Sequence, residues 1–542
     1  MKNMFDGSIG FFECLPRYME QLSELNLKIM QAACDKVMAT QTYWKGVLKY
    51  TDDFATPFGT AVNSFSGTEK ERLFAVPPLD NLQGYLELFL FNLQLAINGF
   101  TSSLEIMNDY HLPKISEANE AWLNTLFGRD GEDITEYTAR QLQMLDVVVN
   151  SYPKAIKDIE PEYGFHFDNG GYVKAAETDR FELYQVLPLD KSVQVREDGK
   201  PIIIVPPYVL GANILAFLPG ENRSYTHCYA NQGIPTYIRI LKDIDTTPAV
   251  QVMTGEDDAR DTRVFCEQLK AKHGKPVTVN GFCQGGLVMV MAILSGELDG
   301  LVDAFITCAS PMDGTRSKSL VGYLKDVPDR FQDMAYATKT LPNGNQVVDG
   351  KLMSWVYKIK SIDQEAPIPV FYRDLKMFDR PGNKELKISK TAAAINYWLL
   401  YERQDLPVAI TQLSYDSYTI PVTEDGTLPV KLFGRKLNFK RIEEMGIKWL
   451  ICYAEQDELV EKEAALAPLD YIHAEVTAFP KGHASIATSW SIPTSQCALH
   501  TCFNNSRGPV CFQMELDQEL QAHNPANLEP SVTPVQQDSQ GE

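Results

Sequence analysis

The sequence predicts an α/β fold, in which a mostly parallel sheet carries helices on both faces. Continuous apolar runs such as residues 201–205 are typical of parallel strands that are buried on both sides. Stretches with helical spacing, such as residues 256–272, alternate with these runs, which is the pattern of strand–helix–strand units. A helical extension before the sheet and an insertion within it complete the predicted organisation.

The predicted strands are short apolar segments bounded by turn residues. In chain order they occupy residues 201–205, 233–241, 277–282, 303–309, 448–453 and 474–479. The helix at 256–272 leads directly into the strand at 277–282.

Residues 1–180 are predicted to form a separate helical region, with breaks at Pro77, Pro113, residues 128–131 and Pro153. Two interpretations of this region remain open. It could be a module for forming homo-oligomers, for binding a partner subunit or for adsorbing to an apolar surface. The plainer interpretation is a helical extension packed on the rest of the chain, because apolar stripes at helical spacing usually belong to a core.

The segment at residues 281–286 reads Gly-Phe-Cys-Gln-Gly-Gly and lies between an apolar strand and an apolar helix. A strained strand-to-helix turn of this kind, called a nucleophile elbow, lifts one side chain above the edge of the sheet. Here that side chain is Cys283. A thiolate suits the transfer of acyl groups between thioesters, because sulfur attacks and leaves with comparable ease. The alternative is a structural cysteine, since cysteine is among the most buried residue types.

An acidic residue and a histidine follow Cys283 in the chain order of the α/β-hydrolase fold. Asp457 stands in the turn after the strand at 448–453, and His483 stands just after the strand at 474–479. We therefore predict that Cys283 attacks an acyl carbon, that His483 takes its proton, and that Asp457 orients the imidazole or helps to deprotonate an incoming hydroxyl. Singly, Asp457 could be a solvated carboxylate and His483 a structural loop residue. The fold class is accordingly predicted as α/β-hydrolase, with a catalytic domain at residues 181–490.

Two backbone amides are expected to stabilise the oxyanion that forms during acyl transfer. One belongs to Gln284, directly after the nucleophile, and the other to Val209, in the proline-rich loop after the strand at 201–205. Losing one such donor typically lowers the rate by about a hundredfold or more. The insertion at about residues 314–440 follows the strand after the nucleophile, where this fold commonly carries a lid that shields the intermediate from water.

These motifs resemble those of the polyhydroxyalkanoate synthases over about residues 201–487. The elbow matches that family's Gly-x-Cys-x-Gly-Gly. Further matching segments are the Pro-Pro pair at 206–207, Pro-Met-Asp at 311–313, the segment at 431–442, Gln-Asp-Glu-Leu-Val at 456–460 and Gly-His at 482–483. The resemblance implies that Cys283 is the nucleophile, Asp457 the acid and His483 the general base. This chain has Leu210 and Ala216 where the family usually carries Asn and Asp.

The resemblance also implies an activity, namely the polymerisation of (R)-3-hydroxyacyl-coenzyme A thioesters into polyhydroxyalkanoate through a cysteine-bound acyl group. Coenzyme A is released, and the chemistry needs no metal and no redox cofactor. Two alternatives stay open. A thioesterase or an intracellular polyester depolymerase would use the same three residues, and a granule-associated or scaffolding protein would carry an idle hydrolase domain.

Composition excludes some classes of function. The formal net charge of −21 argues against a general nucleic-acid binder, which would show a basic footprint. Ten cysteines without paired spacing favour a reducing cytosol, and granules of a polyester product are a further expected location. The first residues lack the pattern of a signal peptide. The most apolar stretch, residues 85–100, is too short and too polar for a transmembrane helix.

In the C-terminal segment, residues 491–542, the alternation of predicted strands and helices fades. Its composition predicts disorder from about residue 524. It contains Cys497, His500, Cys502 and Cys511. Their spacing fits no strong zinc signature, so no metal site is predicted there.

Overall fold

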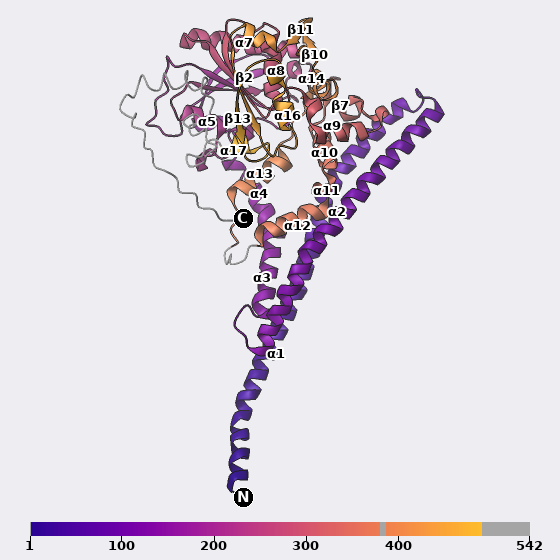
Figure 1. Cartoon of the computed structure of the whole chain (residues 1–542), viewed down its shortest axis with the longest axis vertical. Coiled ribbons are helices and arrows are strands. Elements are labelled where there is room, and N and C mark those ends of the chain that lie inside the picture. Colours follow the sequence, from indigo (N-terminus) through magenta and orange to yellow (C-terminus); the bar gives the residue numbers. More distant parts are fainter. Residues whose placement is uncertain (1, 380–385, 490–542) are drawn as a thin grey trace.

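The computed structural model describes the backbone of residues 2–379 and 386–489, and the side chains of residues 15–379 and 386–488. The predictions for residues 491–542, including the disordered tail and the four Cys and His residues, lie outside the described residues. The described part consists of a sheet with its covering helices, a helical insertion, and two long N-terminal helices that extend away from the sheet (Figure 1).

The central sheet has eight strands in the order β1-β2-β4-β3-β5-β6-β12-β13. Their bounds are β1 Tyr172–Glu177, β2 Phe181–Val186, β3 Ile202–Val205, β4 Thr236–Leu241, β5 Val277–Phe282, β6 Val302–Cys308, β12 Lys448–Ala454 and β13 Glu475–Phe479. Only β2 runs opposite to the common direction of the other seven strands. If these strands are counted one to eight along the chain, their order is 1-2-4-3-5-6-7-8, with the nucleophile turn after the fifth. This is the α/β-hydrolase fold, as predicted.

Two layers of helices cover the sheet. Helices α5 (Tyr225–Ala230) and α17 (Ser485–Ser489) pack together, and α7 (Gly255–His273), α8 (Gln284–Leu294) and α15 (Lys440–Glu444) form a second group. The middle of the sheet is apolar because both faces are covered: every side chain of β3 and β5 is buried.

The sheet begins earlier than the sequence predicted. Strand β1 lies before the expected boundary at residue 181, inside the region that was assigned to helices. Its residues are mostly exposed because it is an edge strand, so it lacks the apolar run that marks the central strands.

Residues between β6 and β12 form the insertion, which lies between the sheet and the long N-terminal helices (Figure 1). Its main helices are α9 Lys318–Asp326, α10 Gly350–Lys360, α11 Ile362–Glu365, α12 Pro367–Phe378, α13 Lys390–Tyr401 and α14 Val408–Thr419. It also contains a three-stranded sheet and a hairpin, formed by β7 Thr338–Thr340, β8 Gln346–Val348, β9 Leu406–Pro407, β10 Thr427–Leu432 and β11 Arg435–Asn438.

The N-terminal region is dominated by two long helices, α1 (Lys2–Arg72) and α2 (Pro78–Phe127), followed by α3 (Ile134–Asp146) and α4 (Tyr152–Asp158). The break predicted at Pro113 is wrong, because α2 continues through it. A proline inside a helix costs about 3 kcal/mol, and packing on both sides offsets this cost. Tyr110 packs edge-on against Tyr372 of α12, and Ala121 is buried in a cluster with α3.

Helices α1 and α2 are docked on the insertion along much of their length. α1 contacts α10 and α12, and α2 contacts α11 and α12. The phenol oxygens of Tyr43 and Tyr372 lie 2.8 Å apart, and Tyr50 donates a 2.6 Å hydrogen bond to the buried Asp374. Together, α1, α2 and their connection form a helical hairpin. Within the described ranges, no helix combines the length and apolar character needed to cross a bilayer.

Candidate active site

Cys283 occupies a strained turn at the end of β5. Its φ of 52° and ψ of −124° place a non-glycine residue at positive φ, which persists only where the surroundings enforce it. Helix α8 begins at the next residue, Gln284. The Cys283 amide donates a 2.7 Å hydrogen bond to the carbonyl of Cys308 on the neighbouring strand, so the turn is tied to the sheet.

Three glycines make this turn possible. A Cβ at Gly281 would lie 2.3 Å from the Cα of Gly286, and one at Gly285 would lie 2.4 Å from the carbonyl oxygen of Pro206. A Cβ at Gly286 would lie 2.0 Å from the hydroxyl of Ser310. The motif therefore has a steric cause: the turn, the start of α8 and the loop after β3 are too close together for side chains.

The structure brings His483 and Asp457 together from the ends of two neighbouring strands. The Nδ1–H of His483 donates a 2.7 Å hydrogen bond to Oδ2 of Asp457. The other carboxylate oxygen accepts 2.9 Å hydrogen bonds from the amides of Leu459 and Val460. Asp457 is buried and held by three donors, so it fixes both the tautomer and the orientation of the imidazole.

The remaining nitrogen of His483, Nε2, is buried, and within the described residues no partner makes a hydrogen bond of normal geometry to it. Burial lowers the pKa of His483, but the charges of Asp457 and Cys283 and the hydrogen bond to Asp457 outweigh this, so its pKa is raised well above 6.5. The Phe282 ring packs edge-on against the imidazole, with 5.6 Å between ring centroids. Nε2 is thus the ring nitrogen of His483 that is left to exchange a proton with Cys283.

The residues predicted to supply the oxyanion amides, Val209 and Gln284, line the same cavity as Cys283. Gln284 is the first residue of α8, and first-turn amides have no partner within their helix. Its side-chain Nε2 donates a 2.6 Å hydrogen bond to Ser414 of α14. Its Oε1 is buried without a partner in the described part of the chain, which leaves an acceptor beside the nucleophile.

A buried polar network holds the loop that carries Val209. Arg239 makes two hydrogen bonds of 2.7 and 3.0 Å to the carboxylate of Asp258, and a third of 2.6 Å to Thr262. The hydroxyl of Tyr208, the neighbour of Val209, donates to the same carboxylate. This network could not be predicted from the sequence, because its members are far apart in the chain and carry no motif.

We expect Tyr208→Phe to reduce both stability and activity. Asp258 would lose one of its donors, which lowers the free energy of unfolding by about 1–3 kcal/mol. A loosened loop would misplace the Val209 amide and reduce kcat by roughly tenfold, part of the larger loss expected for a missing donor. Thermal unfolding and kcat, measured well below the Tm, check both effects. Tyr237→Phe is the matched control, because its buried hydroxyl bonds to His273, and it should lose stability alone.

The cavity at Cys283 has a volume of about 1010 Å³ and a predominantly apolar surface. At the nucleophile it is lined by Tyr357 of α10 and Tyr418 of α14. Burial, and then the charge of Cys283, raise the pKa of Tyr357 to about 12 and that of Tyr418 well above 10. Both phenols therefore stay protonated near neutral pH and can donate hydrogen bonds.

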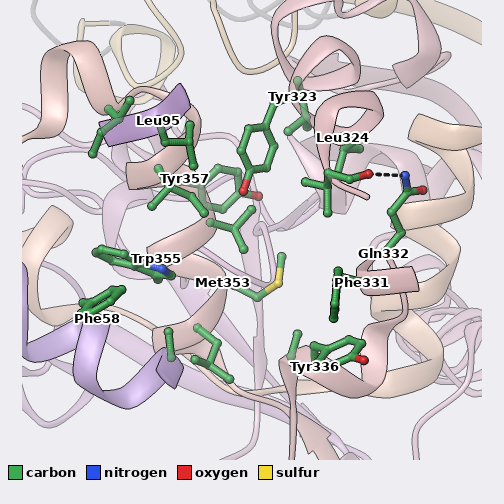
Figure 2. Close-up of a pocket in the computed structure, with 18 of the residues that line it drawn as sticks. Phe58, Leu95, Tyr323, Leu324, Phe331, Gln332, Tyr336, Met353, Trp355 and Tyr357 are labelled. Atoms are coloured by element: carbon green, nitrogen blue, oxygen red, sulfur yellow. Dashed lines mark hydrogen bonds between the residues drawn. The ribbon is translucent and has the colours of Figure 1, made fainter. Parts of the chain in front are cut away.

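Away from the nucleophile, the cavity reaches the helical hairpin. Figure 2 shows Phe58 of α1 and Leu95 of α2 together with Tyr323, Met353 and Trp355 of the insertion. This wall of the cavity was not predicted from the sequence. The signal was present as Phe54, Phe58, Ala61, Val62 and Phe65 at helical spacing, but such a stripe does not distinguish a packed core from a cavity wall.

No group of His, Cys, Asp and Glu side chains within residues 15–379 and 386–488 has the arrangement of a metal site. Six cysteines in this part of the chain are free thiols, and five of them, including Cys283, are buried.

Comparisons with known proteins give weak likenesses. No family model matches the chain, and no curated protein matches it. Among solved structures it is similar to Est1E from Butyrivibrio proteoclasticus, with 12% identity, a TM-score of 0.32, and coverage of 65% of this chain and 100% of that one. A serine hydrolase involved in carbazole degradation has 15% identity and a TM-score of 0.29, with coverage of 58% and 93%. An esterase from a Rhodococcus species has 11% identity and a TM-score of 0.28, with coverage of 65% and 99%. At such TM-scores the likeness carries no argument, and the fold assignment rests on the strand order and the elbow.

Proposed function

We propose that this protein is an acyltransferase that polymerises (R)-3-hydroxyacyl-coenzyme A thioesters into a polyhydroxyalkanoate and releases coenzyme A. One observation carries the proposal: a buried cysteine at a nucleophile elbow shares a largely apolar cavity with protonated phenols, beside a histidine that a buried carboxylate orients. The motifs that resemble the polyhydroxyalkanoate synthases surround these same residues.

In the first half of the proposed reaction, His483 takes the thiol proton of Cys283, and the thiolate attacks the thioester carbonyl. The amides of Val209 and Gln284 stabilise the oxyanion. The intermediate collapses by breaking the bond to the coenzyme A sulfur, which leaves with the proton from His483. Cys283 now carries the acyl group.

In the second half, the hydroxyl of an incoming hydroxyacyl thioester gives its proton to His483 and attacks the acyl group on Cys283. An ester bond forms, and the Cys283 sulfur is released and regains the proton from His483. The lengthened thioester then transfers its chain back to Cys283 and releases coenzyme A, so each cycle adds one unit.

Two features of the cavity support transfer over hydrolysis. Its apolar surface disfavours water near the acyl group, and the exclusion of water protects such intermediates. The unpartnered Oε1 of Gln284 offers an acceptor to a substrate hydroxyl close to the reacting carbon. A thioesterase or depolymerase would use the same three residues but would admit water at this point.

The purified full-length protein should release coenzyme A from 3-hydroxybutyryl- and 3-hydroxydodecanoyl-coenzyme A and form insoluble polymer. Coenzyme A release is followed with a thiol reagent, and chromatography quantifies polymer and free hydroxy acid. Free acid in the same amount as coenzyme A would replace the proposal with a thioesterase. An absence of coenzyme A release with both substrates would favour a scaffolding role.

A further inference from the structure

The hairpin side of the cavity is built by the helical hairpin and the insertion together. α1 contributes Phe58 and Ala61, α2 contributes Leu95, and α9 and α10 contribute Leu324 and Met353. Figure 2 shows aromatic and aliphatic side chains from both parts around the same space. The cavity therefore has a polar end, with Cys283 and the phenols of Tyr357 and Tyr418, and a largely apolar end at the hairpin.

Specific contacts fix the hairpin in this position. The ring of Phe54 lies 4.9 Å from that of Trp355, and the ring of Phe65 stacks 5.6 Å from that of Tyr336. Phe91 of α2 packs 6.0 Å from Tyr323 of α9. Each pair joins the hairpin to the insertion through residues that also line the cavity. The side chains that form this wall are therefore the ones that hold the hairpin in place.

A buried polar cluster joins the hairpin to the insertion near the C-terminal end of α1. Glu69 of α1 accepts a 2.7 Å hydrogen bond from Arg330 and one of 2.5 Å from Tyr336, and it also accepts one from Tyr85 of α2. Glu69 is 7% exposed. Hydrogen bonds to a charged carboxylate are strong. Three of them, from three segments of the chain, therefore fix the position of the hairpin relative to the insertion.

The volume and lining of the cavity define what fits there. About 1010 Å³ is at the upper end of the range of roughly 300–1,000 Å³ for small-molecule sites. It is far more than a short acyl group needs. An apolar cavity of this kind favours an apolar occupant over water, and here it opens directly onto the nucleophile.

We propose that the helical hairpin forms one wall of a site for a long apolar acyl chain, which lies between α1, α2 and the insertion while its carbonyl carbon is bound to Cys283. This inference rests on the proposed function of Cys283 as an acyl carrier. It makes residues of α1 determinants of chain-length specificity, although they precede the nucleophile by more than two hundred positions.

Replacing Ala61 with tryptophan tests the wall, because the larger side chain would fill the apolar end and leave the polar end unchanged. We expect kcat/KM for 3-hydroxydodecanoyl-coenzyme A to fall at least tenfold and that for 3-hydroxybutyryl-coenzyme A to stay within twofold. Ala55→Trp is the matched control, since Ala55 is exposed on the same helix and does not line the cavity. Equal losses with both substrates, or no loss with either, would overturn the proposal.

Binding separates this inference from the proposed reaction. In a Cys283→Ala background, which cannot form the acyl-enzyme, calorimetric titration with the two thioesters measures affinity alone. The long thioester should bind more tightly, by roughly fourfold for each added methylene that the cavity buries, and Ala61→Trp should abolish the difference. If the enzyme turned over neither thioester but this preference remained, the proposed function would fail and the acyl site would stand. If the enzyme turned over both thioesters but bound the long one no more tightly, the proposed function would stand and the acyl site would fail.

Discussion

Replacing Cys283 with alanine should lower the rate of coenzyme A release by about 10⁶-fold, the loss seen when the nucleophile of a serine-protease triad is removed. The backbone geometry should survive, because alanine has the same Cβ as cysteine at the strained φ of 52°. The expected loss is therefore chemical and not structural. Steady-state release of coenzyme A, together with a thermal unfolding curve, measures both.

Cys34→Ala provides the control for this experiment, since Cys34 is an exposed free thiol on α1. It should leave the rate unchanged. If Cys283→Ala retained full function, the scaffolding interpretation would replace the enzymatic one. A trapped acyl group on Cys283, detected by mass spectrometry after a brief reaction with substrate, would be direct support for the covalent step.

Replacing Asp457 with asparagine should lower kcat/KM by about 10³- to 10⁴-fold, as for the equivalent change in a serine protease triad. The reason lies in the hydrogen bonds of this carboxylate. Its Oδ1 accepts two backbone amides, so an asparagine would keep its oxygen there and turn its NH₂ group toward His483. The imidazole would then carry its proton on Nε2, facing Cys283, and could not accept another.

The same substitution should change the pH dependence of stability. The pKa of His483 is raised well above 6.5: burial lowers it, but Asp457 and Cys283 raise it by more. A raised pKa in the folded state stabilises the protein fully below the unfolded value of about 6.5, and this contribution disappears as the pH rises through the folded pKa. Denaturant titrations from pH 5.5 upward should show this loss in the wild type and not in Asp457→Asn. Glu458→Gln, an exposed neighbour, should behave like the wild type in both rate and pH dependence.

Much of the fold follows from local patterns in the sequence. The strands β3, β5, β6 and β12 are apolar because both faces of the sheet are covered. A continuous apolar run in the sequence indicates such a strand. Strand β1 was not predicted, because an exposed edge strand does not require a continuous run of apolar residues. The continuation of α2 through Pro113 depends on contacts with α12 and α3, which no local window contains.

The candidate site divides in the same way. Cys283, Asp457 and His483 were predictable, because this fold places such groups just after strand ends in a fixed chain order. The geometry now joins His483 to Asp457, while the catalytic roles stay a prediction. Tyr357 and Tyr418 were not predictable, because they come from helices of an insertion whose packing leaves no sequence motif. The same holds for the hairpin wall, which only long-range packing turns into part of the cavity.

The cavity wall also has a consequence for how the protein is made. Phe58 leaves the ribosome well before Trp355, its partner across the cavity. At about 5–20 residues per second, the apolar stripe of α1 would wait roughly 15–60 s for the segment that covers it. During synthesis that stripe is an exposed apolar surface, and a chaperone that protects nascent chains would bind to it.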